Sequence, residues 1–378
     1  MSLTNTLAPQ SPEELAETLG SAGAKRRTIT LGGRFSKNRM AGPIEPADVT
    51  ITTSGLSRVL SYEPKDLTIS VEAGLPWAEL TRLLEENRQM VPLDPPYSGA
   101  GTVGGVVSSN CSGPRRRLYG TARDLVIGMT FATMEGKLVK SGGMVVKNVA
   151  GLDMGKLMIG SFGTLAGVAV VNFKLLPMPQ VERLFLLSFD SLEAAVAARD
   201  SILNSVLQPS SMDLVNPAAA RILGWTGHTL AVQAGGNAMV VDRYEKELRR
   251  IGKLERAERS VFAALQEFTP WYLATHENGA VVRISCRLSE VGEVMKGFET
   301  PVVARAGTGV CYVYFENPQA AEAAGAAHKA IMEFAPEAQK PNLNLWPAPG
   351  PDFELMKRIK RMLDPQNLLN RGRLYRQI

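Results

Sequence analysis

A glycine-rich stretch at residues 90–113, MVPLDPPYSGAGTVGGVVSSNCSG, has the composition of backbone that lies against a bound ligand. Glycine lets the main chain approach a ligand closely and reach positive φ, and small neighbours leave amide N–H groups open to an anion. A second glycine turn, at residues 32–36, directly follows a short β-rich segment, where N–H groups can hold a phosphate. A simple tight turn explains that second segment equally well. Together the two segments predict a site for an anionic ligand.

Within the first stretch, Gly99, Gly101 and Gly104 spell the G-x-G-x-x-G pattern of dinucleotide-binding turns, and Asp124 follows about 20 residues later. That pattern requires a buried strand that runs into its first glycine. Three prolines between 92 and 96 precede it instead, and proline cannot donate to a sheet ladder. A nicotinamide site of the Rossmann type is therefore not favoured.

Cysteine and histidine are sparse. The chain has three of each among 378 residues, with no C-x-x-C, H-x-H or H-E-x-x-H spacing, so no metal site is predicted. An iron–sulfur cluster held by this chain alone is excluded, because it needs four thiolates. The formal charge of +5 suits anionic ligands, whereas the mixing of basic with acidic residues and the few aromatics disfavour nucleic-acid binding. The basic run at 115–117 is most simply a solvated face.

Regular elements must position the two glycine segments. Residues 11–23 begin with Ser-Pro-Glu-Glu and predict a capped helix, and residues 75–87 predict an amphipathic helix that leads into the long glycine-rich stretch. Short alternating segments at 26–31, 49–52 and 67–71 predict strands, so both glycine segments arise from one α+β unit. No apolar run reaches the roughly 18 residues of a membrane span, and the N-terminus lacks a secretory signal pattern.

From residue 181 onward, strands and helices alternate in a way that predicts a sheet covered by helices on one face. In this half, four side chains are able to bind a carboxylate or take a proton: Arg283, Arg287, Arg305 and His276. For each of them a structural ion pair or a surface position is the simpler interpretation. Catalytic residues therefore remain unknown at the level of sequence.

Several motifs in a fixed order carry a family resemblance. They are the early glycine turn, VEAGLPWAEL at 71–80, GTVGG at 101–105, YGTARD at 119–124, KNVAGLD at 147–153, GSFGTL at 160–165, FKLLP at 173–177 and MLDPQNLLNRGRLY at 362–375. In this order they resemble the FAD-binding flavoprotein family of vanillyl-alcohol oxidase and p-cresol methylhydroxylase. PLDPP at 92–96, SGPRR at 112–116 and LMIGSFGTL at 157–165 resemble most closely the smaller FAD-binding subunits of bacterial glycolate oxidases.

The resemblance implies an α+β fold with a two-subdomain FAD-binding domain of the p-cresol methylhydroxylase type at 1–180. A second α+β domain at 181–345 would cap the flavin, and residues 346–378 would return to the FAD-binding domain. The early turn would wrap the pyrophosphate, and the N–H groups of 101–105 would face the pyrophosphate and ribityl chain. The residues that the resemblance places on FAD are Gly32, Gly33, Arg34, Phe35, Ser36, Gly101, Thr102, Val103, Gly104, Gly105, Ser108, Asn110, Gly113, Gly163, Val168 and Arg373.

Two positions depart from the family pattern. Phe35 stands where many relatives have the histidine that tethers the flavin, which implies non-covalent FAD, and Arg371 stands where the closing motif has proline. The resemblance implies an oxidoreductase that acts on the CH–OH group of small 2-hydroxy acids, in a complex with a larger flavin subunit and an iron–sulfur subunit. Two alternatives stay open: a free-standing FAD-dependent 2-hydroxy acid dehydrogenase and a non-catalytic assembly subunit. The expected location is cytoplasmic, with any membrane association made through partner subunits.

Overall fold

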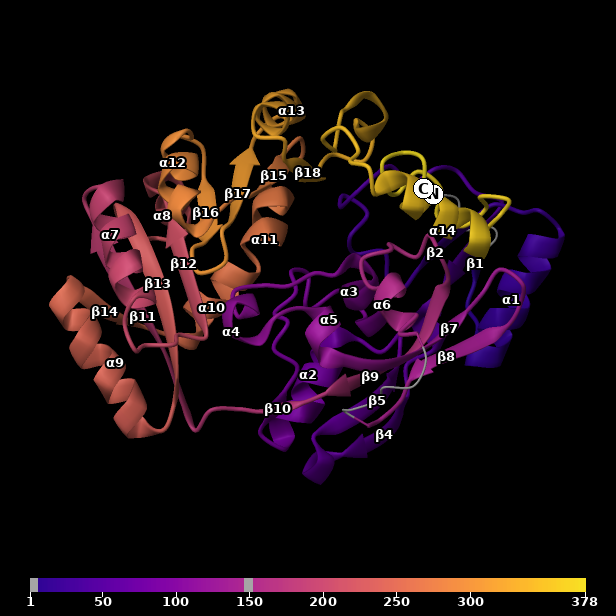
Figure 1. The fold of residues 1–378 in the computed structure, drawn as a ribbon, viewed down its shortest axis with the longest axis horizontal. Helices are drawn as coiled ribbons and strands as arrows, with labels where there is room; N and C mark the ends of the chain where they lie inside the picture. The colour runs from indigo at the N-terminus through magenta and orange to yellow at the C-terminus, as the bar shows by residue number, and fades with distance from the viewer. Residues whose placement is uncertain (1–5, 146–151) are drawn as a thin grey trace. The chain divides into compact units, whose positions relative to one another are not determined.

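The computed structural model describes residues 6–145 and 152–378 (Figure 1). The chain divides into two compact units, one made of residues up to 111, 121–178 and 348–378, the other of residues 112–120 and 179–347. The β-sheets and the buried hydrophobic clusters of one unit are separate from those of the other, and the two units are described separately. Most of the KNVAGLD motif, residues 147–151, lies outside the described residues.

Two larger sheets and one small strand pair build the first unit. A parallel sheet has the order β1-β3-β2, an antiparallel sheet has the order β4-β5-β9-β7-β8, and β6 pairs with β10. The strands are β1 (Thr6–Leu7), β2 (Ile29–Gly32), β3 (Val49–Thr52), β4 (Val59–Glu63), β5 (Thr68–Glu72), β6 (Gln89–Met90), β7 (Val126–Ala132), β8 (Leu138–Gly142), β9 (Gly167–Lys174) and β10 (Leu176–Pro177).

Helices cover these sheets. The predicted capped helix is α1 (Pro12–Ala24), and the Ser11 hydroxyl accepts a hydrogen bond from the Glu14 amide at 3.1 Å, as an N-cap should. Leu15 and Leu19 of α1 are fully buried in a core shared with β7 and β9. The remaining helices of this unit are α2 (Trp77–Glu86), α3 (Val103–Ser109), α5 (Ala122–Leu125), α6 (Gly155–Met158) and α14 (Phe353–Leu363).

Helix α3 occupies the second half of the glycine-rich stretch, which the sequence predicted to be a loop. Thr102 caps this helix by accepting a hydrogen bond from the Gly105 amide at 3.2 Å. A Cβ at Gly104 would lie 2.8 Å from the Ala73 Cβ, so glycine is needed there for close packing. Gly104 and Gly105 both have helical φ angles, so neither uses the positive φ that glycine permits.

An eight-stranded antiparallel sheet forms the centre of the second unit, in the order β14-β11-β13-β12-β16-β17-β15-β18 (Figure 1). Its strands are β11 (Val181–Phe189), β12 (Ser211–Val215), β13 (His228–Gly236), β14 (Leu254–Ala257), β15 (Ala280–Ser285), β16 (Val302–Arg305), β17 (Val310–Phe315) and β18 (Ile331–Phe334). Its helices are α4 (Arg116–Tyr119), α7 (Leu192–Leu203), α8 (Pro217–Ile222), α9 (Ala238–Ile251), α10 (Arg259–Gln266), α11 (Phe268–Thr275), α12 (Val291–Lys296) and α13 (Pro318–Ala327).

Both faces of this sheet carry helices, so the prediction of helices on one face only is wrong. Along β17, Cys311 and Val313 belong to the core that lies under α7, α9, α12 and α13. Because side chains alternate along a strand, Tyr314 points to the opposite face. There the rings of Phe268 and Tyr272 from α11 lie 4.8 and 5.1 Å from the Tyr314 ring.

The basic run at 115–117 packs inside the second unit, which corrects the expectation of a solvated face. Arg117 donates to the Pro209 carbonyl oxygen at 2.8 Å, and all three arginines are half-buried. The Arg115 guanidinium lies 5.5 Å over the Phe262 ring and 3.8 Å from the Glu182 carboxylate. Sequence composition did not reveal these partners because they lie more than 60 residues away.

Candidate functional site

The first unit contains a pocket with about 960 Å³ of empty space, part of it open to solvent. Four segments that are distant in sequence supply most of its wall: residues 29–38 after and within β2, residues 102–109 around α3, residues 162–168 before and within β9, and residues 370–373 near the C-terminus.

The turn after β2 has the geometry of an anion-binding loop. Within residues 6–145 and 152–378, the backbone N–H groups of 33–36 have no protein acceptor. A Cβ at Gly33 would lie 2.2 Å from the Thr102 hydroxyl, so glycine lets this turn touch the start of α3. Phe35 has φ +54°, which bends the backbone sharply next to the pocket. This turn therefore offers open amide donors to a ligand.

The glycines of the GTVGG motif use their amides differently from what the sequence predicted. Gly101 N–H donates to the Tyr97 carbonyl at 2.8 Å, Val103 N–H to Leu75 at 2.9 Å, and Gly104 N–H to Ala73 at 2.6 Å. Together with the Gly105 bond to Thr102, these interactions tie α3 to β5 and α2. The prediction that these amides face a pyrophosphate is corrected, because they already bond within the chain.

The structure brings most of the predicted ligand-contacting residues together around the pocket. Gly101, Val103, Asn110 and Gly113 do not line it: Val103 is fully buried under α3, Asn110 ends that helix at φ +51°, and Gly113 belongs to the second unit. The predicted residues that do line it are Gly32, Gly33, Arg34, Phe35, Ser36, Thr102, Gly104, Gly105, Ser108, Gly163, Val168 and Arg373.

The closing segment of the chain enters the pocket through Asn370. Its side-chain amide donates to the Leu31 and Phe162 carbonyl oxygens at 2.9 and 2.8 Å, and its carbonyl oxygen accepts from the Leu31 amide at 2.7 Å. One side chain thus holds β2, the turn at 162–163 and the C-terminal segment in a fixed arrangement. Sequence reasoning missed Asn370 although it lies inside the recognised closing motif, because its partners are more than 200 residues away.

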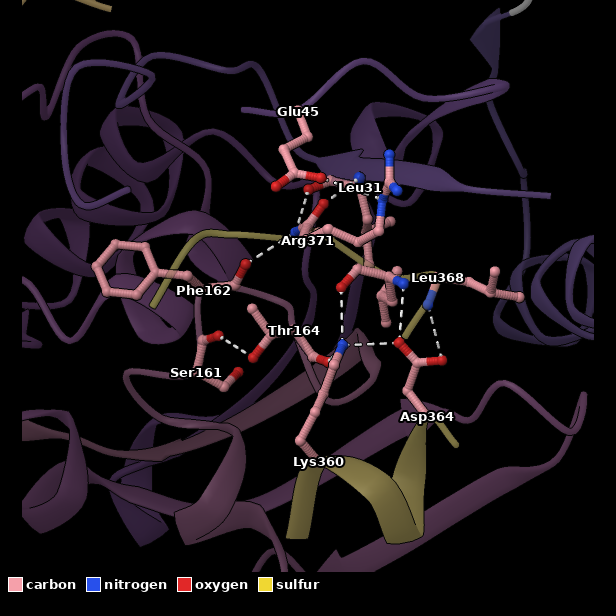
Figure 2. Close-up of polar contacts among 11 residues, drawn as sticks. Leu31, Glu45, Ser161, Phe162, Thr164, Lys360, Asp364, Leu368 and Arg371 are labelled. Atoms are coloured by element: carbon pink, nitrogen blue, oxygen red, sulfur yellow. Dashed lines mark hydrogen bonds and ion pairs between the residues drawn. The ribbon is translucent and has the colours of Figure 1, made fainter. Parts of the chain in front are cut away.

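A buried ion pair anchors the segment that carries Asn370 (Figure 2). The Lys360 ammonium donates to Asp364 at 2.7 Å, to the Thr164 carbonyl at 2.8 Å and to the Leu369 carbonyl at 3.0 Å. The Asp364 carboxylate in turn accepts from the amides of Leu368 and Leu369 at 3.0 and 2.8 Å. Burial lowers the pKa of Lys360, and the adjacent Asp364 carboxylate opposes that shift. All three N–H donors of Lys360 are satisfied.

Positive charge dominates the pocket wall, which carries Arg34, Lys37, Arg371 and Arg373 but only one carboxylate, Glu45. Arg371 lies 3.5 Å from Glu45 (Figure 2), and its side chain also donates to the Pro46 carbonyl. Arg373 donates to the Gly42 carbonyl at 2.6 Å, with its guanidinium 5.5 Å over the Phe162 ring. Lys37 and Arg371 were not among the predicted contacts, although Lys37 directly follows the predicted turn. An excess of cations beside open amides suits an anionic ligand.

In the second unit, three of the four candidate side chains contact other side chains, and the fourth, Arg287, is exposed. Arg305 lies 3.1 Å from Asp213, and Arg283 lies 3.2 Å from Glu333, whose pKa burial raises. The His276 ring stacks on Tyr272 with centroids 4.1 Å apart. The Arg287 backbone amide donates to Glu290 at a helix start. Among the described residues, no group of three His, Cys, Asp or Glu side chains is placed to hold a metal ion.

Comparison with protein families indicates which ligand this pocket binds. Residues 4–142 match the FAD binding domain family, and residues 348–374 match the C-terminal domain of FAD linked oxidases. The chain therefore contains an FAD-binding domain, its fold is that of p-cresol methylhydroxylase and related FAD oxidases, and FAD is its cofactor. The family resemblance drawn from the motifs is thereby confirmed. The open amides, glycine contacts and cation excess of the pocket fit the anionic, elongated FAD molecule.

The relatives of this chain include two glycolate oxidase subunits and a D-lactate dehydrogenase. The chain is 23% identical to glycolate oxidase subunit GlcD of Bacillus subtilis, over 98% of this chain and 88% of that protein. It is 34% identical to glycolate oxidase subunit GlcE of Escherichia coli, over 44% of this chain and 48% of that protein. It is 31% identical to the mitochondrial D-lactate dehydrogenase (cytochrome) of Arabidopsis thaliana, over 57% of this chain and 38% of that protein. The last two alignments therefore span less than half of each relative.

Solved structures agree on the fold. An alkyldihydroxyacetonephosphate synthase matches with a TM-score of 0.74 at 18% identity, covering 97% of this chain and 75% of that one. A p-cresol methylhydroxylase matches with a TM-score of 0.73 at 15% identity, covering 97% and 88%. Identities this low establish the fold alone. No helix within the described residues is long and apolar enough to span a membrane.

Proposed function

We propose that this chain is the FAD-binding subunit of a glycolate oxidase-like complex that oxidises a small 2-hydroxy acid and passes the electrons to a partner subunit. The observation that carries the proposal is the pocket of the first unit, whose open turn amides and cationic wall fit FAD. The alignments with two glycolate oxidase subunits support the substrate class and the complex. The proposed partners are a larger flavin subunit and an iron–sulfur subunit.

Bound FAD would supply the chemistry by accepting a hydride from the C–OH carbon, while the hydroxyl proton passes to a base or to water, so that the 2-hydroxy acid becomes a 2-oxo acid. The residues of this chain bind and orient that cofactor. The turn at 33–36 would present its amides to the phosphates, and Asn370 fixes β2, which leads into that turn, against Phe162. Arg373, buried beside Phe162, provides a fixed positive charge in the same pocket.

The cofactor is proposed to be non-covalently bound. Phe35 takes the position of the tethering histidine, and its ring packs over Gly32, where a Cβ would lie 2.5 Å from the ring. Among the described residues that line the pocket there is no histidine, cysteine or tyrosine to form a flavin bond. Acid denaturation of the purified yellow protein is expected to release intact FAD into the supernatant. Flavin that remains with the precipitate would refute the non-covalent assignment.

A free-standing 2-hydroxy acid dehydrogenase is the second candidate, favoured by the alignment with D-lactate dehydrogenases. Such an enzyme needs a cation for the substrate carboxylate and a base for the hydroxyl proton. In this chain the two half-buried candidate cations, Arg283 and Arg305, are already paired with Glu333 and Asp213. Those pairs favour the subunit over the free-standing enzyme.

Turnover with an artificial dye tests the two candidates. The purified chain, loaded with FAD, is assayed with glycolate and with D-lactate, alone and after co-expression with a larger flavin subunit. The proposal expects slow or no turnover by the chain alone and restored turnover in the complex. Brisk turnover by the chain alone would establish the free-standing dehydrogenase. A colourless chain that cannot be reconstituted with FAD would instead support the assembly subunit.

A further inference from the structure

Lys37 places a buried ammonium at the wall of the FAD pocket. It follows the turn at 33–36 directly, and a Cβ built on Gly101 would lie 3.1 Å from its Nζ atom. The side chain therefore reaches from the turn toward the central glycine stretch. Its Nζ is shielded from solvent, and within the described residues it has no hydrogen-bond partner.

Lys360 of the same unit shows what a buried ammonium normally requires. Its three donors bond to Asp364 and to the carbonyl oxygens of Thr164 and Leu369. An ammonium without such acceptors is costly to bury, because it loses its hydrating water and gains no hydrogen bond or ion pair to replace it. The buried charge of Lys37 is therefore explained by an acceptor that the polypeptide does not itself provide.

Other groups of the pocket do not compete for this role. Arg371 is paired with Glu45 and bonded to Pro46, and Arg373 is bonded to Gly42. Glu45 is the one carboxylate among the described lining residues, and it forms an ion pair with Arg371. Lys37 therefore stands next to the open amides of 33–36 with its charge available to an incoming anion.

We propose that Lys37 binds the diphosphate of FAD and that, before FAD arrives, its unsatisfied charge destabilises the first unit. The diphosphate is the group of FAD with a permanent negative charge, and the turn that precedes Lys37 has the open amides that suit it. A compact ammonium is a common ligand of phosphate oxygens. The inference depends on FAD binding and is independent of the 2-hydroxy acid and of any partner subunit.

The test compares Lys37→Met, which keeps the length and apolar stem of the side chain, with Lys65→Met, a control at an exposed position of the same unit. The full chain is stripped of FAD, and the apoprotein Tm and the Kd for FAD are measured. Loss of a charge-assisted hydrogen bond predicts a rise in the FAD Kd of about 10- to 100-fold for Lys37→Met. The apoprotein Tm is expected to rise, because the unsatisfied charge is gone. The control should change neither quantity.

The proposal predicts that one variant, Lys37→Met, has a more stable apoprotein and a weaker affinity for FAD. A Tm that falls in the apoprotein would show a structural role for Lys37 and overturn the proposal, as would an FAD Kd within threefold of the wild-type value. The ³¹P resonances of bound FAD, recorded at saturating cofactor, are expected to shift in Lys37→Met relative to the control. Unshifted ³¹P resonances with a weakened Kd would place Lys37 on another part of FAD and refute the assignment to the diphosphate.

Discussion

Replacing Lys360 by methionine is expected to destabilise the first unit strongly. The change removes three hydrogen bonds and leaves Asp364, which is 1% exposed, as a buried carboxylate without its cation. Breaking a buried ion pair by removing one partner costs about 3–5 kcal/mol. That amount is large beside the roughly 5–15 kcal/mol that stabilises a whole protein.

Urea unfolding of Lys360→Met, followed by circular dichroism, gives the change in free energy, and titration with FAD gives the Kd. Lys357→Met is the matched control on the same helix, because Lys357 pairs with Glu354 at the surface. Exposed pairs of this kind contribute about 0–1 kcal/mol. The FAD Kd should also rise in Lys360→Met, because the loosened segment carries Asn370 into the pocket.

A double variant, Lys360→Met with Asp364→Asn, separates the lost cation from the stranded carboxylate. Its destabilisation should be smaller than the sum of the two single effects, because the asparagine leaves no buried charge. The reasoning fails if Lys360→Met unfolds at the same urea concentration as Lys357→Met. It also fails if the two single effects in the pair simply add.

Outcomes are expected for four further variants. Gly105→Val should raise the FAD Kd and keep the fold, because a Cβ there meets only the Thr102 hydroxyl, at 3.3 Å. Gly104→Val should instead destabilise the fold by about 1–3 kcal/mol, seen as a lower Tm, because the valine side chain overpacks against Ala73. Equal Tm values for Gly104→Val and Gly105→Val would contradict this distinction. Hydrogen bonds from Arg256 and Arg249 lower the pKa of Glu245 from 4.5, so its stabilisation exists above that pH and is lost as pH falls through the folded-state pKa. The free energies of unfolding of wild type and Glu245→Gln, measured by denaturant melts, should therefore converge in acid. A difference between them that stays constant with pH would contradict this role of Glu245. Ser11→Ala should cost about 1 kcal/mol in the same assay by removing the α1 cap, and no change would show that the cap is dispensable.

Local sequence signals predicted the local features of the first unit. Ser11 marked the start of α1 because capping depends on neighbours three residues away, and the turn at 32–36 was identified because glycines follow a β-rich segment. The family motifs also indicated the FAD-binding domain, because their order along the chain is specific. Predicting these features requires only residues that are close in sequence, or the order of many motifs along the chain.

Features that depend on distant partners were not predictable in this way. The helix at 103–109 contains two glycines and is held by bonds to Ala73 and Leu75, which no local propensity reveals. Arg117 looked like part of a solvated run, yet its partner Pro209 is 92 residues away. Lys37 gave no signal beyond its position after a turn, because what matters is that nothing in the described structure meets its charge.

The pocket joins residues made early in synthesis to residues made near the end of this chain. Asn370 bonds to Leu31 across 339 positions, and the second unit, residues 112–120 and 179–347, is translated between them. A ribosome-bound chain that stops before residue 364 lacks the buried ion pair and the groups that close the wall. Such a chain has the glycine turn but cannot complete the pocket around it. We therefore expect stable capture of the cofactor only after translation has passed the closing segment.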